Sequence, residues 1–246
     1  SRVCIFQQKN PRNIAALCAF FVKGLCGFAN TLVFSTILSF GSSNLSITPV
    51  ELLLGFPTNL IIAWRERRSV QWSICIPLIV LMLAGNIPGI FLLKNTDSGG
   101  VKIFFGLVIV LIGMETLARE YFPKKAKESK IILAVVGILS GILSGMYGIG
   151  AMMAAYVSRV TKDSKAFKAN MCAVFIVENI FRIFLYTITG ILTWRIAAYA
   201  AVLYPVMLVG LFAGIKSAGL LDEQAVKRIV IVMLILSGGA LVLNNL

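Results

Sequence analysis

The sequence predicts an all-α polytopic membrane protein with two homologous, inverted repeats, each a Gly-broken segment, re-entrant or kinked, followed by three transmembrane helices. Three observations predict this fold class: the hydrophobic composition, the length of the apolar stretches and an internal duplication. Hydrophobic residues make up 59% of the 246 residues and charged residues only 13%. So few polar residues cannot cover a soluble globule, and the chain therefore belongs in a lipid bilayer.

Apolar stretches of spanning length follow one another along the chain, separated by short charged loops. A helix that crosses the hydrocarbon core needs about 20 predominantly apolar residues. Six plain stretches approach or exceed this length, at 49–64, 72–93, 103–118, 169–194, 196–215 and 229–246. Two longer ones lie at 14–41 and 131–158. None alternates with a period of two residues, which argues against a transmembrane barrel.

An internal duplication divides the chain into two repeats, residues 1–123 and 124–246. Residues 14–123 can be laid over residues 131–246 so that four apolar stretches fall on four others in the same order. The aligned pairs include Gly24 with Gly145, Gly27 with Gly148, Asn59 with Asn179 and Trp72 with Trp194. Repeats of this kind are common in transporters, and chance matching among glycine-rich spans is the alternative.

The first segment of each repeat is longer than one crossing requires and has glycines near its middle. Glycine weakens a helix, so the chain can turn back near Gly27 in 14–41 and near Gly148 in 131–158. Each segment then enters and leaves the membrane on one side. Close packing of small residues between unbroken helices is the alternative.

The basic residues also bear on topology. With both long segments re-entrant, most lysines and arginines fall in the loops 65–71, 119–130, 159–168 and 216–228. The positive-inside rule then makes these loops cytoplasmic and puts the loop 189–195 outside. A mixed model, in which only 131–158 is re-entrant, agrees still better with the charges but breaks the symmetry. Topology explains the net charge of +13, so we expect no nucleic-acid partner.

The missing residue types argue against an enzyme. The chain has no histidine, so neither a Ser/His dyad nor an HExxH zinc helix can form. It has no P-loop for ATP, and its five cysteines show no disulfide or zinc spacing. We therefore expect no catalytic residues, no metal and no cofactor.

Five ionisable residues lie inside apolar stretches: Lys23, Glu51, Glu115, Glu178 and Arg182. A charge at the centre of the membrane costs about 2.5–3.5 kcal/mol on insertion scales, so each needs a partner, a cavity or a route to the interface. Glu51 and Glu115 lie near the ends of their stretches, where we expect them to reach headgroups or to pair locally.

Glu178 and Arg182 are four residues apart and share one helix face. They form either a structural ion pair or part of a site in which Arg182 binds an oxyanion and Glu178 is the proton-coupling candidate. Asn30, Asn59 and Asn179 could add neutral hydrogen-bond donors.

Lys23 lies just before the expected break at Gly27. It either satisfies the carbonyl groups left bare there or attracts an anion to the free amides of the next helix. The substrate-binding candidates are therefore Lys23, Asn30, Asn59, Asn179 and Arg182, together with the backbone at Gly27, Gly148 and Gly150.

The glycine-rich segments KGLCGFAN (residues 23–30) and SGMYGIGA (residues 144–151), with ENIFRIFLYTITGIL at 178–192, resemble the TauE/SafE sulfite exporter family, the four-TMS sulfite exporters. The resemblance covers nearly the whole chain. It implies a polytopic inner-membrane permease that moves small sulfur-containing anions such as sulfite, sulfoacetate or other sulfonates, commonly outward. Where the family often has further glycines, this chain has Phe28 to Asn30 and Ile149 to Ala151.

We therefore expect a secondary transporter, or permease, of small sulfur-containing anions in a prokaryotic plasma membrane, with proton coupling as an option. Its expected partners are the anion and the lipid bilayer, and a homo-oligomer is left open. The alternative is a non-transporting anchor or scaffold subunit.

Overall fold

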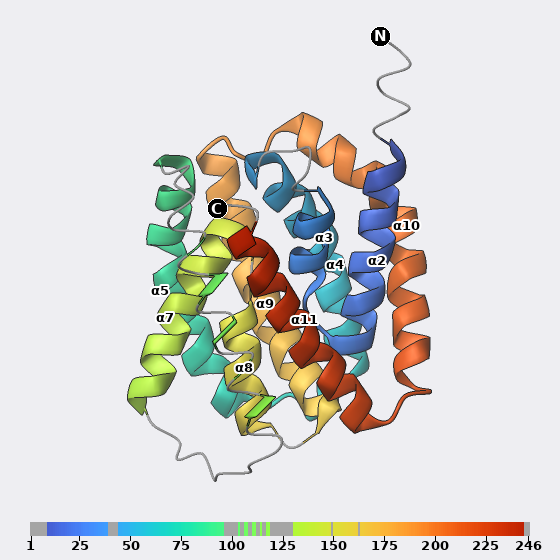
Figure 1. The fold of residues 1–246 in the computed structure, drawn as a ribbon. Coiled ribbons are helices and arrows are strands. Elements are labelled where there is room, and N and C mark those ends of the chain that lie inside the picture. Colours follow the sequence, from blue (N-terminus) through green and yellow to red (C-terminus); the bar gives the residue numbers. More distant parts are fainter. Residues whose placement is uncertain are drawn as a thin grey trace.

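A computed structural model describes residues 9–38, 44–95, 130–148, 150–161 and 163–243, with isolated helical positions between 103 and 118. The described residues form helices and no strand, which confirms the all-helical class (Figure 1). The elements are α2 Lys9–Cys26, α3 Asn30–Leu38, α4 Asn44–Arg65, the 3-10 helix η1 Arg67–Ser69, α5 Trp72–Asn95, α7 Lys130–Tyr147, α8 Ala151–Val160, α9 Ser164–Ile188, α10 Trp194–Ala218 and α11 Glu223–Leu243.

Four described helices are long and apolar enough to cross a membrane. They are Ile47–Arg65, Trp72–Leu92, Ser164–Ile188 and Trp194–Ala218. Their outward faces carry exposed apolar side chains such as Val80, Phe184 and Phe212. Such side chains suit contact with lipid, because they have no hydrogen bonds to lose when water is absent. The stretch 103–118 lies mostly outside the described residues, and the stretch 229–246 falls largely within α11.

The boundaries of α9 differ from the predicted stretch 169–194. The helix begins earlier because the Asp163 side chain accepts a hydrogen bond of 2.6 Å from the Ala166 amide, which satisfies one free donor of the first turn. It ends at Ile188 because Gly190 has a φ of 73°, a conformation that stops a helix.

Both long segments are broken at the predicted glycines. Between α2 and α3, Gly27 has a φ of 87° and Ala29 a φ of 70°. Between α7 and α8, Gly148 has a φ of 72°. Left-handed residues of this kind end helices, and Ala29 adopts the conformation despite its Cβ, which costs roughly 1–2 kcal/mol.

The first broken segment doubles back on itself. Arg12 near the start of α2 and Leu38 at the end of α3 line the same cavity. Ala15 and Phe34 likewise belong to one buried cluster, so α3 returns along α2 (Figure 1).

The second broken segment also doubles back. Contacts between α7 and α5 advance together along both helices, from Gly137 against Leu81 to Gly145 against Asn86. The start of α9 contacts the start of α5, and the middle of α9 contacts the middle of α5. Since α7 and α9 both run parallel to α5, α8 must run back from the end of α7 to the start of α9.

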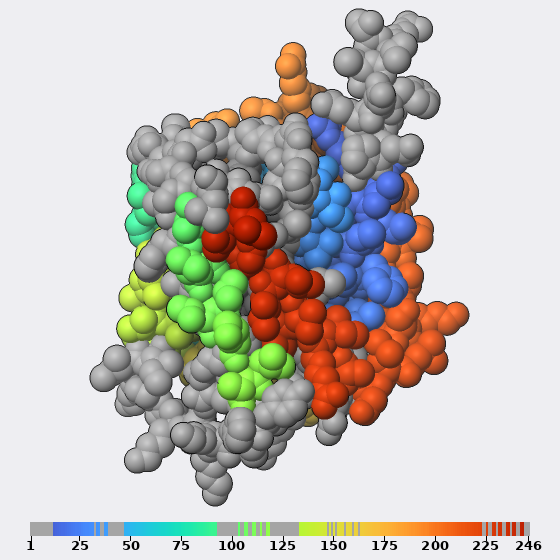
Figure 2. Space-filling model, in the orientation of Figure 1, coloured from blue at the N-terminus to red at the C-terminus, as the bar shows by residue number. Residues whose placement is uncertain are grey.

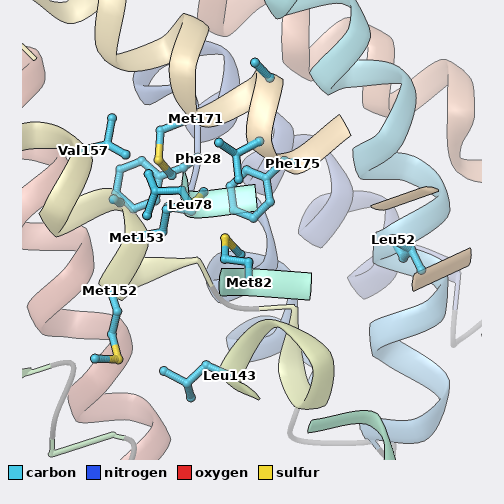
Figure 3. Packing of buried hydrophobic residues seen from close by; sticks show 14 of the residues in the cluster. Phe28, Leu52, Leu78, Met82, Leu143, Met152, Met153, Val157, Met171 and Phe175 are labelled. Atoms are coloured by element: carbon cyan, nitrogen blue, oxygen red, sulfur yellow. The ribbon is translucent and has the colours of Figure 1, made fainter. Parts of the chain in front are cut away.

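The helices pack closely around apolar side chains. Gly24 and Gly214 let α2 approach α10, and Gly85 and Gly141 let α5 approach α7, an arrangement typical of membrane helices. A large cluster beside α8 and α9 includes Phe28, Met82, Met153, Met171 and Phe175 (Figure 3). On the face shown in Figure 2, α11 lies diagonally across the molecule.

Candidate functional site

Four charged side chains are buried among the described helices. Lys23 lies on α2, Glu51 on α4, and Glu178 and Arg182 on α9. Each is at most 4% exposed. A buried charge is tolerated only where other charges or hydrogen bonds compensate its lost hydration, so the partners of each one define the site.

The first part of the site forms at the break between α2 and α3. Lys23, in the last turn of α2, donates from Nζ to Asn30 Oδ1 at 3.2 Å. Asn30, the first residue of α3, donates from Nδ2 to Glu51 Oε1. The Thr31 side chain is another hydrogen-bond partner of the Glu51 carboxylate. The turn at residues 27–29 therefore brings a lysine and an amide together on one carboxylate.

The second part of the site is built around Glu178. Its Oε1 accepts hydrogen bonds from Ser144 Oγ at 2.8 Å and from Asn86 Nδ2 at 3.2 Å. The same oxygen lies 3.5 Å from Arg182 Nε. The pair predicted from the i,i+4 spacing is thus present, and α5 and α7 hold its carboxylate from the other side.

The Arg182 guanidinium is fixed in place by an aromatic residue one turn further along α9. Arg182 donates from one terminal nitrogen to the Tyr186 hydroxyl at 3.1 Å, and Tyr186 donates to the Gly145 carbonyl at 2.9 Å. The guanidinium carbon also lies 5.2 Å from the centre of the Tyr186 ring, close enough for a cation–π interaction. These contacts leave the other terminal nitrogen to face the first part of the site.

The two parts meet at Gly148, in the break between α7 and α8. A Cβ atom built on Gly148 would lie 3.0 Å from Thr31 Cγ2, 3.2 Å from Glu51 Oε2 and 3.4 Å from Arg182 Nη1. The break in the second repeat therefore lies against the start of α3 and both charged groups. The start of α3, which carries free amides and a partial positive charge, and the end of α7, which carries a partial negative charge, both lie at this point.

The structure gathers five of the predicted site residues and places four elsewhere. Lys23, Asn30, Gly148, Glu178 and Arg182 lie together. Gly27 instead faces the Lys168 side chain, and Gly150 faces the Phe175 ring. Asn59 and Asn179 are buried, but no described hydrogen bond joins them to the cluster.

Of the two alternatives expected for Glu51, headgroup contact or a local partner, the structure contradicts the first, and the carboxylate is bonded to Asn30. Helix α4 begins at Asn44, seven residues before Glu51 rather than two, and α3 covers the carboxylate, so that Glu51 is only 4% exposed. Glu115 lies outside the described residues. Ser144 and Tyr186 were missed, because hydroxyl side chains in apolar stretches give no signal until the helices are placed in space.

A cavity of about 460 Å³ opens where α4 and α10 end and α9 begins. We call it the basic vestibule, since its lining includes Arg65, Lys165 and Lys168 as well as Glu66 and Asp163. It also reaches Gly24, the neighbour of Lys23. The Lys168 side chain lies between this vestibule and the site, with Cγ 2.7 Å from where a Cβ on Gly27 would be.

A second cavity, of about 190 Å³, lies at the opposite ends of the same helices. Its lining is largely apolar, with Leu38, Ile47 and Leu203, and Arg12 and Arg195 contribute charge. Of these two cavities, the vestibule is the larger and has the more polar lining.

Described helices that are long and apolar enough to cross a membrane, with charged side chains buried between them, are the architecture of a polytopic integral membrane protein. The family model described as "Sulfite exporter TauE/SafE" matches residues 13–241. The chain belongs to this family, whose members are membrane transporters that export sulfur-containing anions. No curated protein and no solved structure matches the chain.

Proposed function

We propose that this chain is a secondary transporter that exports a small sulfur oxyanion, sulfite or a short organosulfonate, and binds it between Lys23 and Arg182. One observation carries the proposal. Two buried cations, Lys23 on α2 and Arg182 on α9, both lie close to the Glu51 carboxylate, where the start of α3 contacts the break at Gly148.

The chemistry of this meeting point suits an oxyanion. Arg182 offers a planar fork of donors that can bind two oxygens at once, while Lys23 adds a second positive charge. Asn30 supplies a neutral donor, and the first turn of α3 supplies backbone amides. A sulfite or sulfonate group has three oxygens and so can engage the guanidinium and the ammonium at the same time.

The basic vestibule supports entry from the cytoplasm. Its lining includes Arg65, Lys165 and Lys168, which belong to the loops that the positive-inside rule assigns to the cytoplasm. A basic funnel also raises the local concentration of anions. The described conformation is then the one that loads substrate from the cytoplasm, as an exporter in a prokaryotic plasma membrane requires.

The helix directions support an inverted repeat with halves 1–123 and 124–246. Helix α2 runs parallel to α10, from Arg12 beside Tyr199 to Gly24 beside Gly214, and so points toward the vestibule end. Helix α7 runs parallel to α5, which starts at the vestibule end. The two hairpins therefore enter from opposite ends, the arrangement that lets a central site alternate between two sides.

Transport of labelled sulfite by proteoliposomes of the purified protein tests this function. We expect uptake above that of empty liposomes for the wild type, and loss of uptake for Arg182→Gln in protein that elutes as a folded species. A scaffold subunit, whose buried charges only join helices, would give no uptake in either protein, and that result would overturn the proposal.

A further inference from the structure

We propose that Glu51 is an internal anion that occupies the substrate site, and that the transported anion binds only when a proton neutralises its carboxylate. This inference rests on the proposed function and assigns the coupling step to a residue outside the predicted pair on α9. The substrate class is a small oxyanion, and the co-transported species is a proton.

The Glu51 carboxylate lies among the donors that an incoming anion needs, and it accepts hydrogen bonds from two of them, Asn30 and Thr31. Oε1 accepts from Asn30, which Lys23 holds in turn, and Oε2 faces Gly148 close to the guanidinium of Arg182. A second oxyanion can reach these donors only if Glu51 releases them.

The charge balance of the site also requires a change at Glu51 when the anion binds. With all four groups ionised, Lys23 and Arg182 balance Glu51 and Glu178, so the buried centre is neutral. A monovalent anion that binds alone would leave one uncompensated negative charge in the membrane interior, which is costly. If Glu51 takes up one proton from water in the vestibule, its carboxylate becomes a neutral acid and the occupied centre stays neutral.

The groups around Glu51 come from several helices. Among the described residues, the charged or titratable ones are Lys23 on α2 and Glu178, Arg182 and Tyr186 on α9. The breaks at α3 and α8 contribute neutral groups only, the Asn30 and Thr31 side chains and the Gly148 backbone. On α10, Tyr204 bonds to the Leu53 carbonyl of α4 rather than to Glu51.

Glu51 is better placed than Glu178 to exchange with substrate. Glu178 is bonded to Ser144 and Asn86 and pairs with Arg182 on its own helix. These contacts tie α9 to α5 and α7, on the side of the Gly148 break away from α3. Glu51 instead accepts from Asn30 at the start of α3 and lies against the break at Gly148, so its release frees Asn30 and opens the space beside Gly148.

The test measures the binding of methanesulfonate, which does not titrate near neutral pH, to the purified full chain in detergent over the neutral pH range. For the wild type, linkage to one proton raises the Kd by about tenfold per pH unit wherever Glu51 is ionised in the free protein. For Glu51→Gln, we expect a Kd that is lower at neutral pH and independent of pH. Asp222→Asn, an exposed acid outside the site, should keep the wild-type slope.

The outcomes separate this inference from the proposed function. Failure of the wild type to bind methanesulfonate or sulfite at any pH would contradict the function itself. Binding with no pH slope, or a slope that survives in Glu51→Gln and disappears in Glu178→Gln, would overturn the role of Glu51 alone. If Glu51→Gln does not fold, Glu51→Asp is the test of the role of Glu51. Its side chain is shorter, so the carboxylate lies farther from Asn30 and Gly148. That variant should keep the slope and bind at least about threefold more tightly, and an unchanged Kd would refute the inference.

Discussion

Neighbouring side chains fix the orientation of the Arg182 guanidinium. Tyr186 holds one terminal nitrogen, and Glu178 lies beside Nε. The remaining terminal nitrogen faces Gly148 and Glu51. A guanidinium fixed in this way recognises an oxyanion by geometry as well as by charge.

Exchange of the two cations should therefore have unequal effects. We expect Arg182→Lys to raise the Kd for sulfite by roughly tenfold or more, because an ammonium keeps the charge but lacks the planar fork. Lys23→Arg should be milder, because arginine keeps the positive charge and can still donate to Asn30. Isothermal titration of both variants measures the difference, and equal losses would argue that Arg182 contributes charge alone.

Removal of the charged pair on α9 tests whether Arg182 binds the anion or only forms a structural ion pair with Glu178. Arg182→Gln alone leaves Glu178 buried without its partner, which costs about 3–5 kcal/mol of stability. The double variant with Glu178→Gln should recover much of this stability, because neither charge is then unpaired. It should nevertheless fail to bind sulfite. Thermal unfolding measures the stability and titration measures the binding of sulfite, both on the same preparations. Wild-type transport by the double variant would show that Arg182 is not part of the binding site.

At the scale of elements, the two helix breaks carry the site. The break at Gly148 places its backbone against Thr31, Glu51 and Arg182, and the break after α2 brings Lys23 to Asn30. Continuous helices would separate these groups along the membrane normal. The glycines therefore serve the site by turning the chain.

Gly148→Ala should impair sulfite binding through crowding as well as strain. Gly190 provides a matched control, since its φ of 73° is close to the 72° of Gly148 but nothing lies within 4 Å of its Cβ position. Both variants should lose about 1–2 kcal/mol of stability from the left-handed backbone. Only Gly148→Ala should also raise the Kd, because its methyl group meets Glu51 and Arg182. Equal Kd values for the two variants would contradict a site at this break.

Much of this element-level architecture could be predicted from the sequence. The excess length of 14–41 and 131–158, together with Gly27 and Gly148, predicted where the helices break. The spacing of Glu178 and Arg182 predicted their pair. Glu51 was assigned wrongly because its depth depends on where α4 begins and on how α3 covers it, and neither is encoded in local hydrophobicity.

At the scale of the whole molecule, the charges and cavities define two different ends. The basic vestibule lies where α4 and α10 end, and the smaller apolar cavity lies where they begin. Charge counting predicted the cytoplasmic end, but it could not locate the vestibule, which exists only once α4, α9 and α10 are packed together.

The topology can be tested by labelling with an impermeant thiol reagent. Single cysteines on a cysteine-free background should be shielded from outside at Lys165 and at Leu220, because both lie at the vestibule end. A cysteine at Thr193, in the turn before α10, should react from outside. Comparable expression of the three variants is the control, and reaction of the Lys165 position from outside would reverse the orientation.

Anion binding between Lys23 and Arg182 can be tested directly by locating a bound anion in the protein. Selenite has the shape of sulfite, and its selenium can be located by anomalous scattering in crystals of the full chain. We expect a selenium peak with oxygens in hydrogen-bonding distance of Arg182 and close to Lys23, at the place where Glu51 accepts the hydrogen bond from Asn30. A peak confined to the vestibule beside Lys165 and Lys168, or no peak at concentrations that saturate transport, would contradict it.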